Sequence, residues 1–253
     1  MDARRPTPGT APLHQAIIIA GGKGERLRPL TNTRPKCLVE VAGRPILDWQ
    51  LASLELAAVE RVVVVGHHLF EAIESFVASR DSRIQVDLVR EDRPLGRGGA
   101  IRLGYQSLGA AGSALALNGD VVCGAGLGPL ETVRLGTGTA AAILAVPLRS
   151  PYGIIEMDDS HVTGFREKPV LDHWINGGVY ALGEEALAMF PAEGDHEDTT
   201  FPALAAAGRL SALRFRGAWR SIDSPKDLRD ADDLVAAGEL SFPHVLSPVG
   251  ESA

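Results

Sequence analysis

The feature that most constrains the fold of this chain is a short apolar run that stops at a glycine-rich turn. Ala16–Ala20 contains three consecutive isoleucines, and three glycines follow within four positions: Gly21, Gly22 and Gly24. A β-branched run of this length is typical of a buried strand. Five basic residues come next, at Lys23, Arg26, Arg28, Arg34 and Lys36. A buried strand that ends in glycines and cations predicts a binding site for a polyphosphate.

Apolar runs alternate with helical patterns over residues 16–147, and this rhythm predicts the fold class. The run at Arg61–Gly66 is apolar at every interior position, as in a parallel strand that is covered on both faces. Further strands are expected at Ile84–Val89, Ser113–Leu117 and Thr139–Pro147. The pattern predicts an α/β protein with a doubly wound, mostly parallel sheet. Ligands bind at the carboxyl ends of such strands, where the glycine turn and Asp120 both fall.

After residue 147 the pattern changes to shorter strands without crossover helices. Strands are expected at Tyr152–Met157, Val162–Arg166 and Ile175–Leu182, which form a β-rich insertion. Ser224 is the expected N-cap of a last helix that has a proline in its first turn. The predicted layout is a disordered lead-in at 1–14, one domain at 15–240 and a tail at 241–253. Within the domain the parts are 15–147, 148–223 and a C-terminal helix at 225–237.

Composition excludes several classes of function. The formal net charge of −7 argues against a nucleic-acid-binding protein, which usually carries a basic excess. No apolar stretch approaches the roughly 18 residues that span a bilayer, so no membrane partner is expected and the location is expected to be cytoplasmic. The two cysteines, Cys37 and Cys123, have no metal-ligand spacing, and the histidines have none either.

Two common phosphate-binding loops fit the glycine turn poorly. The dinucleotide fingerprint G-x-G-x-x-G matches Gly22 and Gly24, but Leu27 stands where its third glycine belongs. Pro29 and Pro35 also follow too soon for the helix of that motif. A Walker P-loop requires Gly-Lys-Ser/Thr, which does not follow here. A turn that is only structural remains a further alternative for the loop taken alone.

The complete spacing of the loop resembles a known signature. Gly21-Gly22-x-Gly24-x-Arg26-Leu27-x-Pro29-Leu30-Thr31, followed by Pro35-Lys36, is similar to that of the sugar-1-phosphate nucleotidyltransferases. This family converts an NTP and a sugar 1-phosphate to an NDP-sugar and pyrophosphate. The resemblance implies a Rossmann-like nucleotidyltransferase fold with a β-rich sugar-binding insertion.

The resemblance assigns roles to the nucleotide half. The catalytic cations would be Arg26 and Lys36, which face the charge on the leaving pyrophosphate. Mg²⁺ would be held by Asp120 and by Asp223, which lies in a Trp219–Pro225 segment similar to the family's W-x-D-x-(G/S)-(T/S)-P segment. In the loop Leu95–Ala100, which holds the base in relatives, many relatives have threonine where this chain has Arg97. The implied nucleotide-binding residues are Ala20, Gly21, Gly22, Gly24, Gly98, Gly99 and Asn118.

The β-rich insertion carries three further motifs of the same family. Tyr152-Gly153 resembles a strand whose glycine meets the sugar, and Phe165-Arg166-Glu167-Lys168-Pro169 resembles the F-x-E-K-P motif. Asn176 stands in a segment similar to the family's N-x-G strand. The resemblance implies that sugar-phosphate binding falls to Gly153, Glu167, Lys168 and Asn176.

The expected reaction is Mg²⁺-assisted in-line displacement, and the first choice of substrates is GTP with a heptose 1-phosphate of the D-glycero-D-manno type. A mannose-1-phosphate guanylyltransferase and a thymidylyl- or uridylyltransferase for a hexose 1-phosphate are the alternatives. A non-catalytic regulatory subunit that senses a nucleotide sugar is the alternative from another class, and a cytidylyltransferase for a non-sugar phosphate shares the glycine loop. The oligomeric state is left open, with a homo-oligomer among the options.

Overall fold

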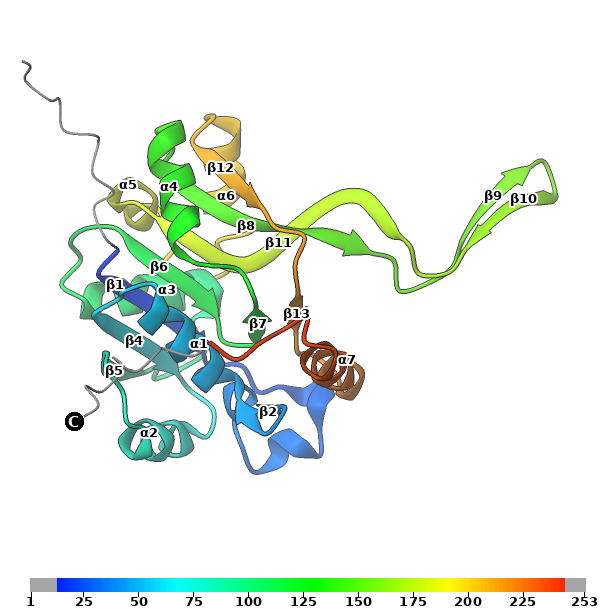
Figure 1. Cartoon of the computed structure of the whole chain (residues 1–253). Helices are drawn as coiled ribbons and strands as arrows, with labels where there is room; N and C mark the ends of the chain where they lie inside the picture. The colour runs from blue at the N-terminus through cyan, green and yellow to red at the C-terminus, as the bar shows by residue number, and fades with distance from the viewer. Residues whose placement is uncertain (1–12, 244–253) are drawn as a thin grey trace, which may run out of the picture.

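The centre of the fold is a seven-stranded sheet built from both halves of the chain (Figure 1). The computed structural model of the chain describes residues 13–243. All neighbouring strands are parallel except at β11, which runs antiparallel to both β6 and β8. The predicted, mostly parallel sheet is therefore confirmed. Across the sheet the strands are β12 (Leu210–Arg214), β8 (Ala141–Arg149), β11 (Val170–Leu182), β6 (Ala114–Asn118), β1 (Gln15–Ala20), β4 (Arg61–Gly66) and β5 (Gln85–Arg90).

Both faces of the sheet are covered, which explains why β1 and β4 are continuously apolar. Neighbouring residues of β1 point to opposite faces, so Ile18 and Ile17 enter different cores and neither is exposed. The core around Ile18 contains residues from α1 (Ile46–Leu56), α2 (Phe70–Ser79) and α4 (Gly128–Thr137). The core around Ile17 contains residues from α3 (Gly96–Ser107), α5 (Glu184–Ala188) and α6 (Thr200–Ala206). This is the doubly wound arrangement that the alternating pattern predicts.

A third apolar cluster joins the C-terminal part of the chain to the basic loop. In it Leu27 from the loop packs with Trp49 of α1 and with Ile222, which follows β13 (Trp219–Ser221). Ala231 of α7 (Pro225–Ala236) belongs to the same cluster. Beside it, β13 pairs antiparallel with β7 (Val121–Cys123), directly after the turn that carries Asp120. The cluster therefore brings the 220s next to the end of β6.

Some elements differ from the sequence prediction. Helix α3 begins at Gly96, inside the predicted base-binding loop, and its glycine-rich first turn packs against residues 191–196. The short helices α4 and α6 were not predicted, because one contains two glycines and the other an internal proline. Helix α7 and its N-cap Ser224 are confirmed.

Strands β9 (Ile154–Asp158) and β10 (His161–Arg166) form a separate two-stranded sheet, here called the arm, which projects from the body of the molecule (Figure 1). In the arm Ile155 pairs with Phe165, and Met157 pairs with Val162. These four side chains share one face and are 48–66% exposed. The opposite face carries the ion pair between Glu156 and Arg166. The predicted β-rich insertion is thus partly an arm and partly a continuation of β8 and β11.

The predicted lead-in at 1–14 and tail at 241–253 lie mostly outside the described residues. Among their described residues, Leu13 is buried, and the ring of Phe242 meets Trp49 edge to face at 5.0 Å between centroids. For the other residues of both segments the layout stays a prediction. Across residues 13–243, the structure has no helix with the length and apolar character needed to cross a membrane.

Candidate active site

A cleft of about 590 Å³ opens at the carboxyl ends of β1 and β6, as expected for an open α/β sheet. Its walls come from four separate segments: the glycine turn after β1, the segment between β5 and α3, the turn after β6, and the segment after β13. A volume of this size suits a nucleotide-sized ligand. The lining includes Ala20, Gly21, Gly22, Gly24, Arg26, Lys36, Glu91, Arg97, Asn118, Asp120, Asp195 and Asp223.

Glycine occupies positions 24 and 22 of the turn for different structural reasons. Gly24 has φ +62°, and a Cβ there would lie 2.9 Å from Thr31 Cγ2, so only glycine lets the loop fold back toward Lys36. The Thr31 hydroxyl donates to the Gly24 carbonyl at 2.7 Å and fixes that fold. A Cβ on Gly22 would meet nothing within 4 Å. Gly22 therefore leaves open space in the cleft, where a phosphate can approach the backbone.

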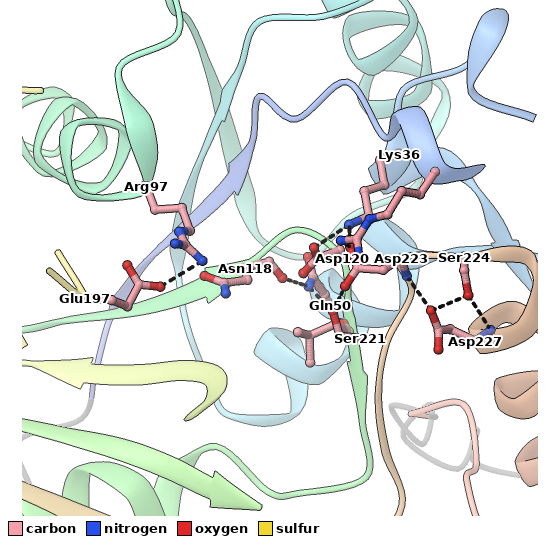
Figure 2. Close-up of polar contacts among 12 residues, drawn as sticks. Lys36, Gln50, Arg97, Asn118, Asp120, Glu197, Ser221, Asp223, Ser224 and Asp227 are labelled. Atoms are coloured by element: carbon pink, nitrogen blue, oxygen red, sulfur yellow. Dashed lines mark hydrogen bonds and ion pairs between the residues drawn. The ribbon is translucent and has the colours of Figure 1, made fainter. Parts of the chain in front are cut away.

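Lys36 lies between two carboxylates that come from distant parts of the chain (Figure 2). Its ammonium donates to Asp120 Oδ2 at 2.6 Å and to Asp223 Oδ1 at 2.7 Å. Arg26 Nη2 donates to the same Asp223 Oδ1 at 2.7 Å. The structure thus brings the four predicted catalytic and metal-binding residues into one cluster.

Burial and charge act against each other at this cluster. Burial acts to lower the pKa of Lys36, but the charges and hydrogen bonds of Asp120 and Asp223 outweigh it, so the pKa is raised. Burial acts to raise the pKa of Asp223, but its bond to Lys36 and the charges of Lys36 and Arg26 hold the pKa below the ordinary value. Both groups are therefore charged at neutral pH.

Asp223 is held in place by the start of α7. Ser221 Oγ donates to Asp223 Oδ2 at 3.1 Å, and the Asp223 backbone N–H donates to Asp227 Oδ2 at 3.2 Å. Asp227 also accepts from Ser224 Oγ at 2.7 Å, and its N–H donates back to that hydroxyl, as in a capping box. The helix cap therefore orients the carboxylate (Figure 2).

The acid in this segment does not stand at the position given by the family pattern. In Trp219–Pro225 the third position, which W-x-D gives to aspartate, is Ser221, and Asp223 follows two residues later. Residues two apart in an extended chain point to the same side. An acid at 223 can therefore reach the side of β13 that an acid at 221 would reach.

Asp120 and Asp223 are suitable ligands for Mg²⁺. Their oxygens already converge on one cationic atom, the Lys36 ammonium nitrogen. In the described part of the chain no third His, Cys, Asp or Glu joins them in a metal-binding group. Mg²⁺ is commonly held by one or two carboxylates together with water and substrate phosphates, so two acids fit this ion.

The turn that carries Asp120 is supported by a residue that the sequence analysis missed. Gln50, a buried residue of α1, donates from Nε2 to the carbonyls of Asn118 at 2.7 Å and Val121 at 3.0 Å. These bonds fix both ends of the turn. The available signal was a glutamine inside an otherwise apolar helical stripe.

The base-binding loop differs from the prediction. Gly98 and Gly99 do not line the cleft; both donate their N–H to the Gly194 carbonyl, at 2.9 and 3.3 Å. A Cβ on Gly98 would lie 2.8 Å from Pro191 Cγ, and one on Gly99 would lie 2.8 Å from the Ala192 carbonyl. Glycine at both positions lets residues 191–196 pack closely on the start of α3.

The structure adds Glu91 and Asp195 to the charged side chains that line the cleft, beside Arg97 of the predicted loop. Arg97 Nη2 donates to Asp195 Oδ2 at 2.7 Å, and Nη1 lies 3.1 Å from Glu197 Oε1 (Figure 2).

Glu91 is only 4% exposed and accepts the Leu95 N–H at Oε1, 3.2 Å away. Its other oxygen, Oε2, lies against Gly21, where any Cβ would collide with it. Burial, the largest cause, raises the pKa of Glu91 above its ordinary value. The position of Glu91 directly after β5 does not by itself mark it as a site residue, because a glutamate after a strand is common on surfaces.

Three of the four predicted sugar residues lie apart from the cleft lining. Gly153 and Glu167 are close together, since a Cβ on Gly153 would lie 3.0 Å from Glu167 Oε2, and Lys168 Nζ lies 3.3 Å from Glu167 Oε1. All three stand at the root of the arm. Asn176, in β11, donates to the Tyr180 hydroxyl at 2.9 Å and accepts the Gly178 N–H at 2.9 Å. Gly153, Glu167 and Lys168 are therefore not part of the Asp120 and Asp223 cluster. Asn176 is nearer to it, because Gly178, to which it bonds, lies against the amide of the cleft-lining Asn118.

Comparison with known proteins gives consistent matches. The family model described as "Nucleotidyl transferase" matches residues 15–238. "Mannose-1-phosphate guanylyltransferase catalytic subunit beta" of Danio rerio is 32% identical over 223 residues, which cover 84% of this chain and 62% of that protein. "Mannose-1-phosphate guanylyltransferase 1" of Arabidopsis thaliana is 32% identical over 224 residues with the same coverage. The chain thus spans 62% of the length of these curated relatives.

Solved structures share the fold. The structure of HddC from Yersinia pseudotuberculosis superposes with a TM-score of 0.68 at 26% identity, over 88% of this chain and 99% of that one. A putative glucose-1-phosphate thymidylyltransferase from Bacillus anthracis, in complex with a sucrose, gives 0.69 at 18% identity, over 87% and 94% of the two chains. At 18% identity the second likeness concerns the fold alone.

Proposed function

The chain belongs to the nucleotidyl transferase family, and we propose that it transfers a guanylyl group from GTP to a sugar 1-phosphate of the mannose type. The observation that carries this proposal is one cleft that combines two kinds of group. It is lined by the cations and carboxylates around Lys36 and by the buried carboxylate of Glu91.

The cluster around Lys36 suits phosphoryl chemistry. In the proposed reaction an oxygen of the sugar phosphate attacks the α-phosphorus of GTP in line. The bond from that phosphorus to the bridging oxygen of the β-phosphate breaks, and pyrophosphate leaves with the electron pair. Lys36 and Arg26 supply positive charge for the departing group, so the protein contributes positioning and electrostatic stabilisation. Mg²⁺, held by Asp120 and Asp223, would neutralise charge on the transferring phosphate when bound.

The carboxylate of Glu91 suits guanine. The Watson–Crick edge of guanine presents two donors, the N1–H and the 2-amino group, and a carboxylate is an acceptor for both. Glu91 lines the cleft, and its Oε2 lies against Gly21 and has no hydrogen-bond partner among the described residues. A site built to accept hydrogen bonds discriminates against bases that lack these donors. The names of the two mannose-1-phosphate relatives support the same base.

The sugar is proposed as a mannose-type 1-phosphate, either the hexose named in the relatives or the heptose expected from the sequence. The two share the manno configuration of the ring, and the heptose has one additional carbon. Sugar-phosphate contacts are proposed for Glu167, Lys168, Gly153 and Asn176. No observation favours the regulatory alternative, since the cations and acids of the cluster are all present and in contact.

Pyrophosphate release tests the proposal directly. Purified protein is incubated with each of five NTPs against mannose 1-phosphate, the heptose 1-phosphate and glucose 1-phosphate, with Mg²⁺ and with EDTA. Turnover is expected with GTP and a manno-configured sugar, and only with the metal. Asp120→Asn and Lys36→Ala serve as inactive controls. Turnover that prefers another NTP contradicts the guanine assignment. No turnover with any pair of NTP and sugar phosphate contradicts the enzymatic proposal.

A further inference from the structure

The cation cluster poses a conflict between the structure and the proposed reaction. Lys36 and Arg26 are proposed to meet phosphates, and Asp120 and Asp223 to meet a metal ion, yet here the cations are bonded to the carboxylates. Asp223 Oδ1 accepts from both cations at 2.7 Å. These two bonds occupy both lone pairs of Asp223 Oδ1, so this oxygen can bind a metal only if a cation leaves it. A metal at this oxygen therefore requires an exchange of partners.

The carboxylates are the fixed members of the cluster. Asp120 lies in a turn whose ends are held by Gln50, and its carbonyl accepts the Ile222 N–H at 2.9 Å. Asp223 is held by Ser221 and by Asp227 of the helix cap. The partners of these acids are therefore more easily changed than their positions.

The cations lie on a segment that has little regular structure. Between β1 and β2 (Glu40–Val41) the chain forms only three-residue 3₁₀ helices, at Glu25–Leu27, Leu30–Asn32 and Lys36–Leu38. The Arg26 side chain is 74% exposed. The Lys36 side chain is 14% exposed, but its ammonium faces the cleft wall rather than a packed core. Rotation of these long side chains can move each charge without moving the sheet.

We infer that Lys36 is an internal counter-ion for the metal site, displaced when a divalent cation enters together with the nucleotide. The inference rests on the proposed function. The two carboxylates and two cations of the cluster sum to zero charge. A divalent cation alone would add two positive charges beside two existing ones, whereas a metal–triphosphate complex adds anionic oxygens that both cations can bind. Free metal therefore binds weakly, and the metal–nucleotide complex binds well.

Manganese binding tests the inference without a catalytic readout. Free Mn²⁺ is titrated by electron paramagnetic resonance against the wild-type protein, Lys36→Met and Lys23→Met, each without nucleotide. Lys23 is the matched control, because it lines the cleft and has no ion pair among the described residues. Lys36→Met is expected to bind Mn²⁺ roughly tenfold more tightly than wild type, since one repelling charge is gone. Lys23→Met is expected to match wild type.

Two further measurements keep the outcomes separate. Lys36→Gln replaces the charge with a shorter, neutral amide, so it should also tighten Mn²⁺ binding if charge is the cause. Circular dichroism checks that each variant is folded. Unchanged or weaker Mn²⁺ binding in folded Lys36→Met and Lys36→Gln overturns the inference. A wild-type protein that binds no Mn²⁺ even with GTP instead contradicts the metal site of the proposed function.

Discussion

At the scale of single residues, the site combines groups that the sequence reveals with groups that only the fold reveals. The glycine turn, Lys36 and Asp120 follow from local sequence, because strand ends in a parallel sheet converge. Glu91 does not, since a glutamate after a strand is common on surfaces. Only the packing of Gly21 against its carboxylate shows that it is buried in the cleft.

Glu91→Gln should reduce the preference for GTP. Glutamine keeps the size of the side chain but replaces one acceptor with a donor, which faces the guanine N1–H. We expect kcat/KM for GTP to fall about 10- to 100-fold, with a smaller change for ITP, which lacks the 2-amino group. Glu193→Gln, an exposed acid paired with Arg93, is the control. Equal losses with GTP and ITP would contradict the proposed contact.

The affinity for GTP should also depend on pH through Glu91. Its pKa lies above 4.5 because of burial, so the carboxylate becomes protonated at a higher pH than an exposed glutamate. Protonation removes the negative charge and turns one acceptor into a donor. The dissociation constant measured by calorimetry should therefore rise as the pH falls toward that pKa. Titration of the triphosphate affects wild type and Glu91→Gln alike, so the variant should lack this additional dependence.

At the scale of elements, the sheet was largely predictable and the glycine-rich helix start was not. Buried parallel strands carry their own signal in continuous apolar runs, as at β4. The first turn of α3 contains Gly96, Gly98 and Gly99, whose helix propensities are poor. It forms because the segment at 191–196, about a hundred residues away in sequence, bonds to it. No local pattern can supply that contact.

The cap of α7 gives a prediction about an element. Ser224→Ala removes the bond to the Asp227 N–H and the bond to its carboxylate, so the free energy of unfolding should fall by about 1 kcal/mol. Chemical denaturation measures this change. Ser75→Ala is the control, because that hydroxyl bonds only a carbonyl of its own exposed helix. A loss no greater than that of the control would mean that the cap does not stabilise the segment after β13.

At the scale of the whole molecule, nucleotide chemistry and the expected sugar motifs occupy different places. The cleft lies at the carboxyl edge of the sheet, while Gly153, Glu167 and Lys168 stand at the root of the arm. From the sequence motifs, all of these residues were expected to form one site, because the order of motifs along a chain gives no distances between them in space. The structure shows two separate groups.

This separation predicts separable kinetic effects. Lys168→Ala should raise the KM for the sugar 1-phosphate about tenfold by removing one charged contact to its phosphate, and should leave GTP binding unchanged. Arg166→Ala, which breaks only the ion pair of the arm, is the control. Initial rates with each substrate varied in turn give both constants. A change confined to the GTP constants would place Lys168 with the nucleotide instead.

The long sequence separation within the acid cluster has a consequence for protein synthesis. Lys36 and Asp223 are 187 residues apart, and β13 can pair with β7 only once residues 219–221 are available. Chains fold from the N-terminus as they leave the ribosome. A nascent chain can therefore build most of its central sheet while Asp223 is still inside the exit tunnel. The cluster of Lys36, Asp120 and Asp223 can form only after Asp223 has left the tunnel.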